Sequence, residues 1–132
     1  MARYRHKASG EVVTFSDYEE ARGRCEVEHF DVALLDLLMP AEPTMLGDEA
    51  RKEFVGREIA IGFPLVLDIS RHVGKIAVAT DMNHHHHPMS AAVDWFHGAA
   101  LQVNGALVRI MHAPLTEDGS KDWAKVLAEL TS

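Results

Sequence analysis

The sequence predicts a single α/β domain built as a three-layer sandwich, with helices on both faces of a mainly parallel sheet. Segments 31–36 and 75–80 are apolar without strict alternation, which is typical of strands buried on both faces. Segments with helical spacing lie between such strands, and right-handed crossovers then place helices on both faces. The 132 residues, 47% of them hydrophobic, suffice for one packed core but not for two ordinary domains, so residues 1–132 are predicted to form one domain.

The predicted strands are short and rich in apolar or β-branched residues. They are expected to run parallel in one sheet at 12–15, 32–36, 75–80 and 106–112. Asn104-Gly105, the dipeptide most favoured in two-residue hairpin turns, lies between 101–103 and 106–110. The last parallel strand is therefore predicted to carry a small antiparallel flap.

The predicted helices are bounded by capping residues. Ser16 and Glu19 have the spacing of a capping box and predict a helix that ends at about Glu28. Pro64 suits the first turn of a long helix, which is expected to end at Gly74. The prolines and glycine of segment 39–47 predict a loop. Further helices are expected at 48–54, at 90–96 with Ser90 as cap, and from Ser120 onwards with Trp123, Val126, Leu127 and Leu130 on one face.

Composition and charge exclude several classes of function. With 13 Lys and Arg against 20 Asp and Glu, the formal net charge is −7, which disfavours binding to nucleic acid or to an anionic membrane. No apolar run approaches the roughly 20 residues that span a bilayer, and no apolar stretch follows the basic residues at the start, as a secretory signal requires. The chain is therefore expected in the cytoplasm, where its only cysteine, Cys25, is a reduced structural thiol.

One short motif resembles that of a known family. The ten residues Asp31-Val32-Ala33-Leu34-Leu35-Asp36-Leu37-Leu38-Met39-Pro40 closely resemble the phosphorylation-site strand of bacterial response-regulator receiver domains. This resemblance implies a flavodoxin-like fold, with Asp36 as the phosphoacceptor, Thr80 as the switch residue and Mg²⁺ as cofactor. It also implies a two-component phosphorelay in which a histidine kinase or another signalling protein is the partner. The residues alone also allow Asp36 to be a loop cap at a strand end and Thr80 a buried strand residue.

Three departures from the receiver pattern indicate a divergent or pseudo-receiver. Nothing before Val12 supplies an apolar strand that ends in the family's acidic pair. Only 35 residues precede Asp36, so either the start is truncated or the sheet is rearranged. His112 stands at the position of the family's lysine. Because the acidic pair and the lysine normally offset phosphoryl charge, phosphorylation is expected to be weak or absent, and the chain to act in signalling rather than as an enzyme.

A run of histidines follows the strand that ends at Thr80. Imidazole is the commonest transition-metal ligand, and alternate residues of an extended loop point the same way. The carboxyl ends of neighbouring parallel strands meet at one edge of a sheet, so these rings are expected near that edge. The candidate ligands for Zn²⁺ or another transition metal are Asp36, Asp81, His84, His85, His86, His87 and His112.

The histidine run leaves further functions open beside the receiver. A metal-dependent hydrolase would use the bound cation next to Asp36, whereas a non-catalytic scaffold would bind metal or oligomerise. The histidine loop itself is alternatively a solvated polar lid over the Asp36 carboxylate that holds no metal. If the first strand is absent, the exposed sheet edge also predicts a homodimer.

Overall fold

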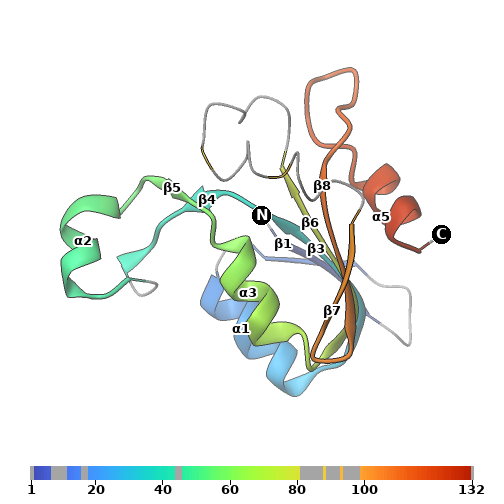
Figure 1. The fold of residues 1–132 in the computed structure, drawn as a ribbon, viewed down its shortest axis with the longest axis horizontal. Coiled ribbons are helices and arrows are strands. Elements are labelled where there is room, and N and C mark those ends of the chain that lie inside the picture. Colours follow the sequence, from blue (N-terminus) through green and yellow to red (C-terminus); the bar gives the residue numbers. More distant parts are fainter. Residues whose placement is uncertain are drawn as a thin grey trace.

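The apolar strands pair into one six-stranded sheet with the order β2-β1-β3-β6-β8-β7 (Figure 1). The computed structural model describes residues 2–6, 12–15, 18–43, 46–80, 88, 93 and 99–131. The strands of this sheet are β1 (Ala2–His6), β2 (Val12–Phe15), β3 (Phe30–Asp36), β6 (Val73–Thr80), β7 (Ala100–Val103) and β8 (Ala106–His112).

The direction of the strands agrees with the prediction from the sequence. Strands β3, β6 and β8 are parallel neighbours. Strand β2 runs the same way, because β2 and β3 are both antiparallel to β1. All four predicted parallel strands therefore share one sheet and one direction, while β1 and β7 run against them.

Strand β1 is the part of the sheet that the sequence analysis missed. Residues 2–6 lie between β2 and β3, with Ala2 opposite Leu35 and Arg5 opposite Val32. The sequence analysis expected no apolar strand with an acidic pair before Val12, and it did not predict the polar, antiparallel strand that lies there. The strand was missed because Ala-Arg-Tyr-Arg-His has no apolar run, and the hydrogen bonds to two neighbours stabilise it instead. The edge of β3 is covered, so the reason given above for a homodimer does not hold.

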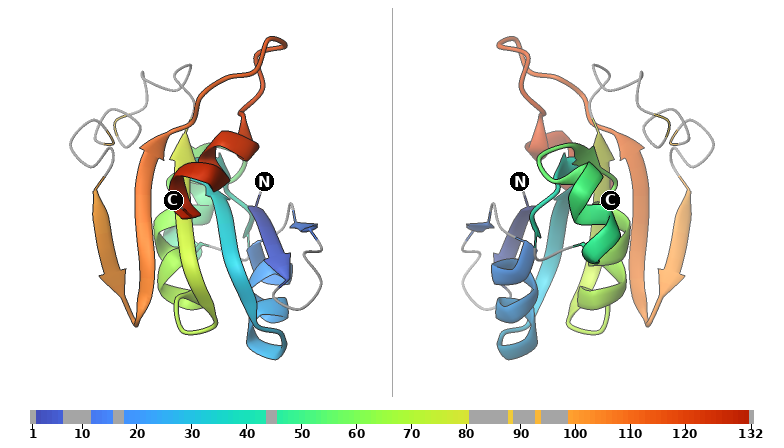
Figure 2. Two further views of the ribbon diagram at one scale, coloured as in Figure 1. Left: turned by 90° about the vertical axis from the view of Figure 1, so that its right-hand side faces the viewer. Right: turned by 90° about the vertical axis from the view of Figure 1, so that its left-hand side faces the viewer.

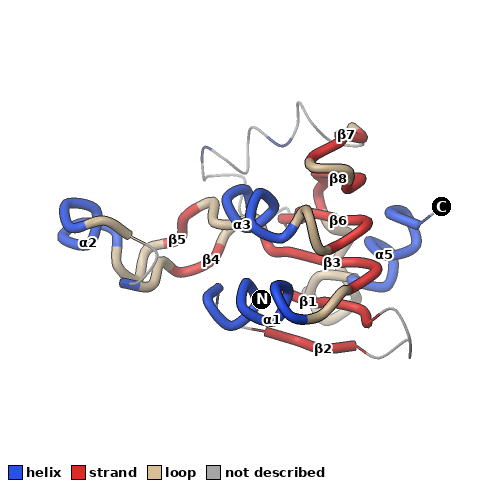
Figure 3. The backbone as a smooth tube through the Cα atoms, turned by 90° about the horizontal axis from the view of Figure 1, so that it is seen from below, coloured by secondary structure: helices blue, strands red, loops and turns tan. Residues whose placement is uncertain are grey.

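Helices cover both faces of the sheet, which confirms the three layers (Figure 3). Helices α1 (Tyr18–Val27) and α3 (Gly62–Ile69) pack on one face, over a core that includes Cys25, Leu65 and Ile69. Helix α5 (Trp123–Thr131) packs on the other face with its predicted apolar side, where Val126 and Leu130 are fully buried.

Two connections differ from the prediction. Segment 39–47 is not all loop, because β4 (Met39–Pro40) pairs with β5 (Glu58–Ile59). Helix α2 (Asp48–Phe54) lies between them as predicted, and the three elements form an arm that projects from the domain (Figure 1). Helix α3 ends at Ile69 rather than at Gly74, because the chain enters β6 at Val73, opposite Phe30 of β3.

Local hydrogen bonds fix the helices and the hairpin. The Tyr18 hydroxyl donates to the Asp68 carboxylate and ties α1 to α3; burial and this bond raise the pKa of Tyr18. Asn104 and Gly105 have φ values of 48° and 87°, so the predicted turn between β7 and β8 has the type I′ conformation.

Asp122, not the predicted Ser120, caps α5 by accepting a 3.1 Å hydrogen bond from the Lys125 N–H. The predicted cap Ser16 and most of the predicted helix 90–96 lie outside the described residues.

None of the helices in the described parts of the chain is both long enough and apolar enough to cross a membrane.

Candidate functional site

The carboxyl ends of β3, β6 and β8 bring three predicted site residues to one edge of the sheet. Asp36 ends β3 opposite Ala79, and Thr80 and His112 end β6 and β8 opposite each other. The backbone pairing of β3 with β6 continues one residue past Asp36, since the Leu37 N–H donates a 2.8 Å hydrogen bond to the Ala79 carbonyl. The predicted meeting of these residues at one edge is therefore correct.

Strand alternation places the three side chains on different faces. Asp36 follows Val32 and Leu34, which belong to the core under α5, so its side chain is on the α5 face. Thr80 and His112 lie two residues after Val78 and Ile110, which belong to the core under α1 and α3. Their side chains are therefore on the α1 and α3 face. Asp36 thus shares the edge with Thr80 and His112, but not their face.

Asp36 is a buried carboxylate. The residue is 7% exposed and follows the buried apolar residues 32–35 of β3. Burying a carboxylate without compensation is costly, so its charge requires a partner.

Lys121 supplies that partner. Its Nζ lies 2.7 Å from Oδ1 of Asp36, and the two side chains are 16% and 10% exposed. The distance is that of a close ion pair between the ammonium and the carboxylate. The same Nζ is 6.0 Å from the centroid of the Trp123 ring, the outer limit of a cation–π contact. The site is therefore a mostly buried carboxylate held by one lysine.

A short hairpin after β8, residues 114–122, positions this lysine; we call it the lysine hairpin. Leu115 and Lys121 form an antiparallel bridge, and the Asp122 N–H donates to the Pro114 carbonyl at 2.7 Å. Asp122 also caps α5, so the helix and the lysine are anchored at adjacent residues.

Asp118 holds the tip of the lysine hairpin together. Its Oδ1 accepts from the Thr116 hydroxyl, from the Ser120 hydroxyl at 2.7 Å and from the Ser120 N–H at 3.0 Å. These bonds, that of Thr116 first, lower the pKa of Asp118 to about 2. Gly119 has a φ of 86°, which closes the turn in a conformation that glycine adopts at little cost.

Gly62 allows the start of α3 to lie close to the backbone of Asp36 and Leu37. A Cβ at this position would lie 2.6 Å from the Asp36 carbonyl oxygen and 3.0 Å from the Leu37 Cα. The Gly62 N–H donates to the Leu37 carbonyl at 3.1 Å. Only a residue without a side chain permits this contact, which fixes the backbone just after Asp36.

Lys121 is the site residue that the sequence analysis did not find. The expectation that no lysine offsets the charge of Asp36 is wrong, since the ammonium comes from the lysine hairpin instead of from the end of β8. The available signal was a lysine directly before the helix cap Asp122, in the connection that leaves the last parallel strand.

The predicted transition-metal site falls largely outside the described residues, which exclude Asp81 and His84 to His87. Within the described ranges, no group of three or more His, Cys, Asp or Glu side chains could hold a metal ion. Asp36 and His112, the two candidate ligands that are described, lie on opposite faces of the sheet.

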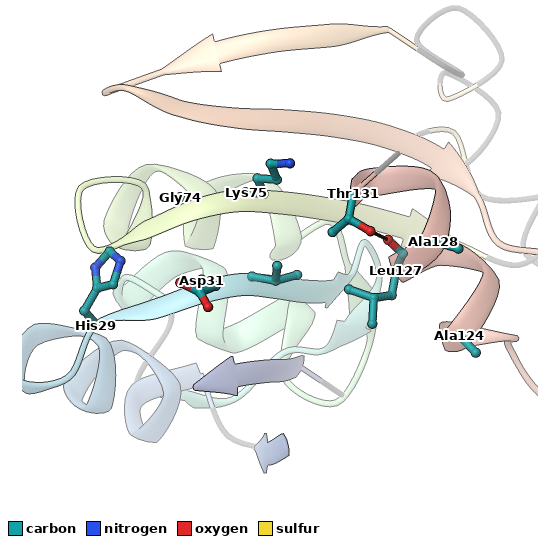
Figure 4. Close-up of a pocket in the computed structure, with 9 residues that line it drawn as sticks. His29, Asp31, Gly74, Lys75, Ala124, Leu127, Ala128 and Thr131 are labelled. Atoms are coloured by element: carbon teal, nitrogen blue, oxygen red, sulfur yellow. Dashed lines mark hydrogen bonds between the residues drawn. The ribbon is translucent and has the colours of Figure 1, made fainter. Parts of the chain in front are cut away.

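A hollow lies toward the other end of β3 from Asp36 (Figure 4). It has a volume of about 690 Å³ and is lined by the start of β3 and β6 and by α5, at His29, Asp31, Val32, Gly74, Lys75, Ala124, Leu127, Ala128 and Thr131. Asp31 and Asp36 are at opposite ends of β3, about 16 Å apart at the rise of an extended strand. This hollow is therefore separate from the buried Asp36–Lys121 ion pair, which defines the candidate site.

Comparison with protein-family models, with curated protein sequences and with solved structures gives no match for this chain.

Proposed function

We propose that this chain is a receiver-like signalling domain that accepts a phosphoryl group on Asp36. The observation that carries the proposal is the Asp36–Lys121 pair, in which a buried carboxylate at the carboxyl end of a central parallel strand meets an ammonium at 2.7 Å. Ligands of parallel α/β sheets bind at this end of the strands. The motif 31–40 and the three-layer architecture support the same interpretation, with the flavodoxin-like fold as part of the proposal.

The proposed chemistry needs a nucleophile and a positive charge. A carboxylate oxygen of Asp36 attacks the phosphorus of a donor, and the bond from phosphorus to the leaving group breaks, with its electron pair departing on that group. The product is an acyl phosphate. Lys121 then faces phosphoryl oxygens, which carry more negative charge than the carboxylate did, and stabilises the charge that develops on them.

The receiver resemblance also implies Mg²⁺, which the described residues do not fit. In receivers the acidic pair that helps to hold the metal ends a first parallel strand. Here β1 is antiparallel, so its carboxyl end at His6 lies opposite Phe30, at the other end of β3 from Asp36. No cluster of carboxylates takes its place in the described parts of the chain. No step is therefore assigned to magnesium.

Phosphorylation of Asp36 would be coupled to α5 through the lysine hairpin. Lys121 must change its contacts when Asp36 is modified, and the next residue, Asp122, caps α5. A shift of the hairpin is therefore coupled directly to the start of α5. The partner in this proposal is a histidine kinase or another signalling protein.

Incubation with acetyl phosphate or phosphoramidate, followed by intact mass measurement, tests the proposal. Weak or absent phosphorylation was expected for want of a lysine, and Lys121 supplies one. We therefore expect one added phosphoryl group, lost in Asp36→Asn and formed roughly a hundredfold more slowly in Lys121→Gln, since removing one stabilising donor typically has such an effect. Parallel reactions with magnesium and with a chelator measure metal dependence separately. Lys125→Gln, on the exposed side of α5, is the matched control. No labelling of the folded wild type, or equal labelling of Asp36→Asn, would refute the phosphoacceptor role.

A further inference from the structure

The two outer strands of the sheet, β2 and β7, differ in their surroundings (Figures 2 and 3). Natural edge strands are commonly protected by charged residues, proline or a bulge. Strand β7 has the sequence Ala-Leu-Gln-Val and pairs with β8 in an unbroken register, so this short strand carries no charged residue, proline or bulge. This leaves an edge suited to pairing with another strand.

An apolar surface adjoins β7. Leu101 of β7 and Leu67 of α3 are 38% and 64% exposed. Both line a pocket of about 350 Å³ whose walls are almost wholly apolar: Phe63, Pro64, Val66, Leu67, Val78, Leu101, Val103, Val108 and Ile110. Exposed apolar surface of this kind marks contacts between proteins.

The hairpin geometry determines which backbone groups of β7 are free to pair. In a two-residue hairpin the residues that flank the turn, Val103 and Ala106, exchange both hydrogen bonds. Because hydrogen-bonded and non-hydrogen-bonded pairs alternate along an antiparallel ladder, Leu101 also directs its N–H and C=O groups toward β8. Ala100 and Gln102 direct theirs away from β8, toward the side of β7 on which no other described strand pairs.

This pattern is self-complementary. We propose that two copies of this chain associate through antiparallel pairing of their β7 strands, about a two-fold axis at Leu101. In this register Gln102 of each copy exchanges both backbone hydrogen bonds with Ala100 of the other. The two Leu101 residues face each other as a non-hydrogen-bonded pair, the closer kind, beside the apolar pocket.

Symmetry and the uncharged composition of β7 favour a second copy as the occupant. The formal net charge of −7 on each chain opposes association, but β7 has no charged residue, so no like charges face each other across the paired strands. A two-fold axis uses the same strand on both copies and closes the contact, so the association stops at a dimer. The pairing strand is short, and we expect a reversible dimer.

Cysteine crosslinking tests the contact and its register. In Leu101→Cys the two introduced thiols face each other across the axis at a separation that a disulfide can bridge, and the native Cys25 is buried and does not compete. We expect a disulfide-linked dimer under mild oxidation. Val12→Cys, an exposed position on the other edge strand, is the matched control and should crosslink roughly tenfold more slowly or less, since only random collisions join it.

Sedimentation velocity over a dilution series tests the native association. The wild type is expected to shift from dimer to monomer on dilution, while Gln102→Pro remains monomeric, because proline removes an outward N–H and leaves the bonds to β8 intact. Circular dichroism confirms that this variant is folded; if it is not, the Leu101→Cys result decides. A wild type that is monomeric at every concentration, or equal crosslinking of Leu101→Cys and Val12→Cys, would overturn the proposal.

Discussion

At the scale of single residues, the Asp36–Lys121 pair differs from the other ion pairs of the described residues. Arg22–Glu19 and Lys52–Glu49 connect exposed side chains one helical turn apart, and such pairs contribute little to stability. Asp36 and Lys121 are mostly buried and come from distant parts of the chain. Removing one partner of a buried pair leaves an uncompensated charge, which is strongly destabilising.

Lys121→Met is therefore expected to lower the free energy of unfolding by about 3 kcal/mol at neutral pH, measured by urea denaturation. Lys125→Met, which removes an exposed lysine, should change it by less than about 0.5 kcal/mol. In the double variant Asp36→Asn/Lys121→Met the buried charge is gone, so we expect part of the loss to be recovered. Strictly additive effects of the two substitutions would show that the side chains are not coupled.

Gly62 makes a second prediction at this scale. Gly62→Ala places a Cβ against the backbone of Asp36 and Leu37, so the start of α3 or the end of β3 must shift. We expect a loss of about 1–3 kcal/mol in unfolding free energy and slower phosphorylation of Asp36. Gly23→Ala, in the middle of α1 where a Cβ meets nothing within 4 Å, should instead stabilise the protein by up to about 1 kcal/mol. Equal effects of the two substitutions would contradict this role for Gly62.

At the scale of elements, the lysine hairpin acts as a preorganised support for the site. Asp118 satisfies the hydroxyls of Thr116 and Ser120 at its tip, and the bridge between Leu115 and Lys121 fixes its base. The lysine is thus presented to Asp36 by a loop with its own hydrogen bonds, rather than by the end of a strand.

Because the pKa of Asp118 is lowered, only strong acid is expected to break the hydrogen bonds at the tip of the lysine hairpin. Its pKa is lowered from 3.8 to about 2, so the hairpin bonds are fully present above pH 3.8 and are lost as the pH falls through about 2. The Ser120 amide resonance, followed by NMR, should titrate with a midpoint near 2. In Asp118→Asn this titration should disappear and phosphorylation of Asp36 should slow. A midpoint near 3.8 would mean that the carboxylate does not accept these bonds.

At the scale of the whole molecule, the sheet depends on β1 although this strand is short and polar. It is the only described link between β2 and the rest of the sheet, since β2 pairs with β1 and β1 with β3. The arm formed by β4, α2 and β5 is the opposite case, because α2 has no buried residue.

Deleting residues 1–6 is therefore expected to abolish cooperative unfolding or to cause aggregation, because the edge of β3 becomes exposed. Replacing residues 47–55, which contain α2, with a glycine–serine linker should preserve the circular dichroism spectrum and most of the thermal stability. Thermal melts and gel filtration of the two variants measure the difference. A deletion variant that melts like the wild type would show that β1 is dispensable.

The sequence alone determined the parts of the fold that follow from local patterns. The buried parallel strands, α1, α2, α5 and the Asn104-Gly105 turn were all predictable, because apolar spacing and turn chemistry act over a few residues. The position of Asp36 at the end of a central strand followed from the same patterns, since the carboxyl ends of parallel strands share one edge.

Only the tertiary structure decided what surrounds Asp36. Strand β1 has no apolar pattern of its own and exists through pairing with both neighbours, and Lys121 meets Asp36 across 85 positions of sequence. Thr80 and His112 were predicted beside Asp36, yet alternation places their side chains on the other face. Such relations depend on which distant residues the packed sheet brings together, and local propensity carries no information about that choice.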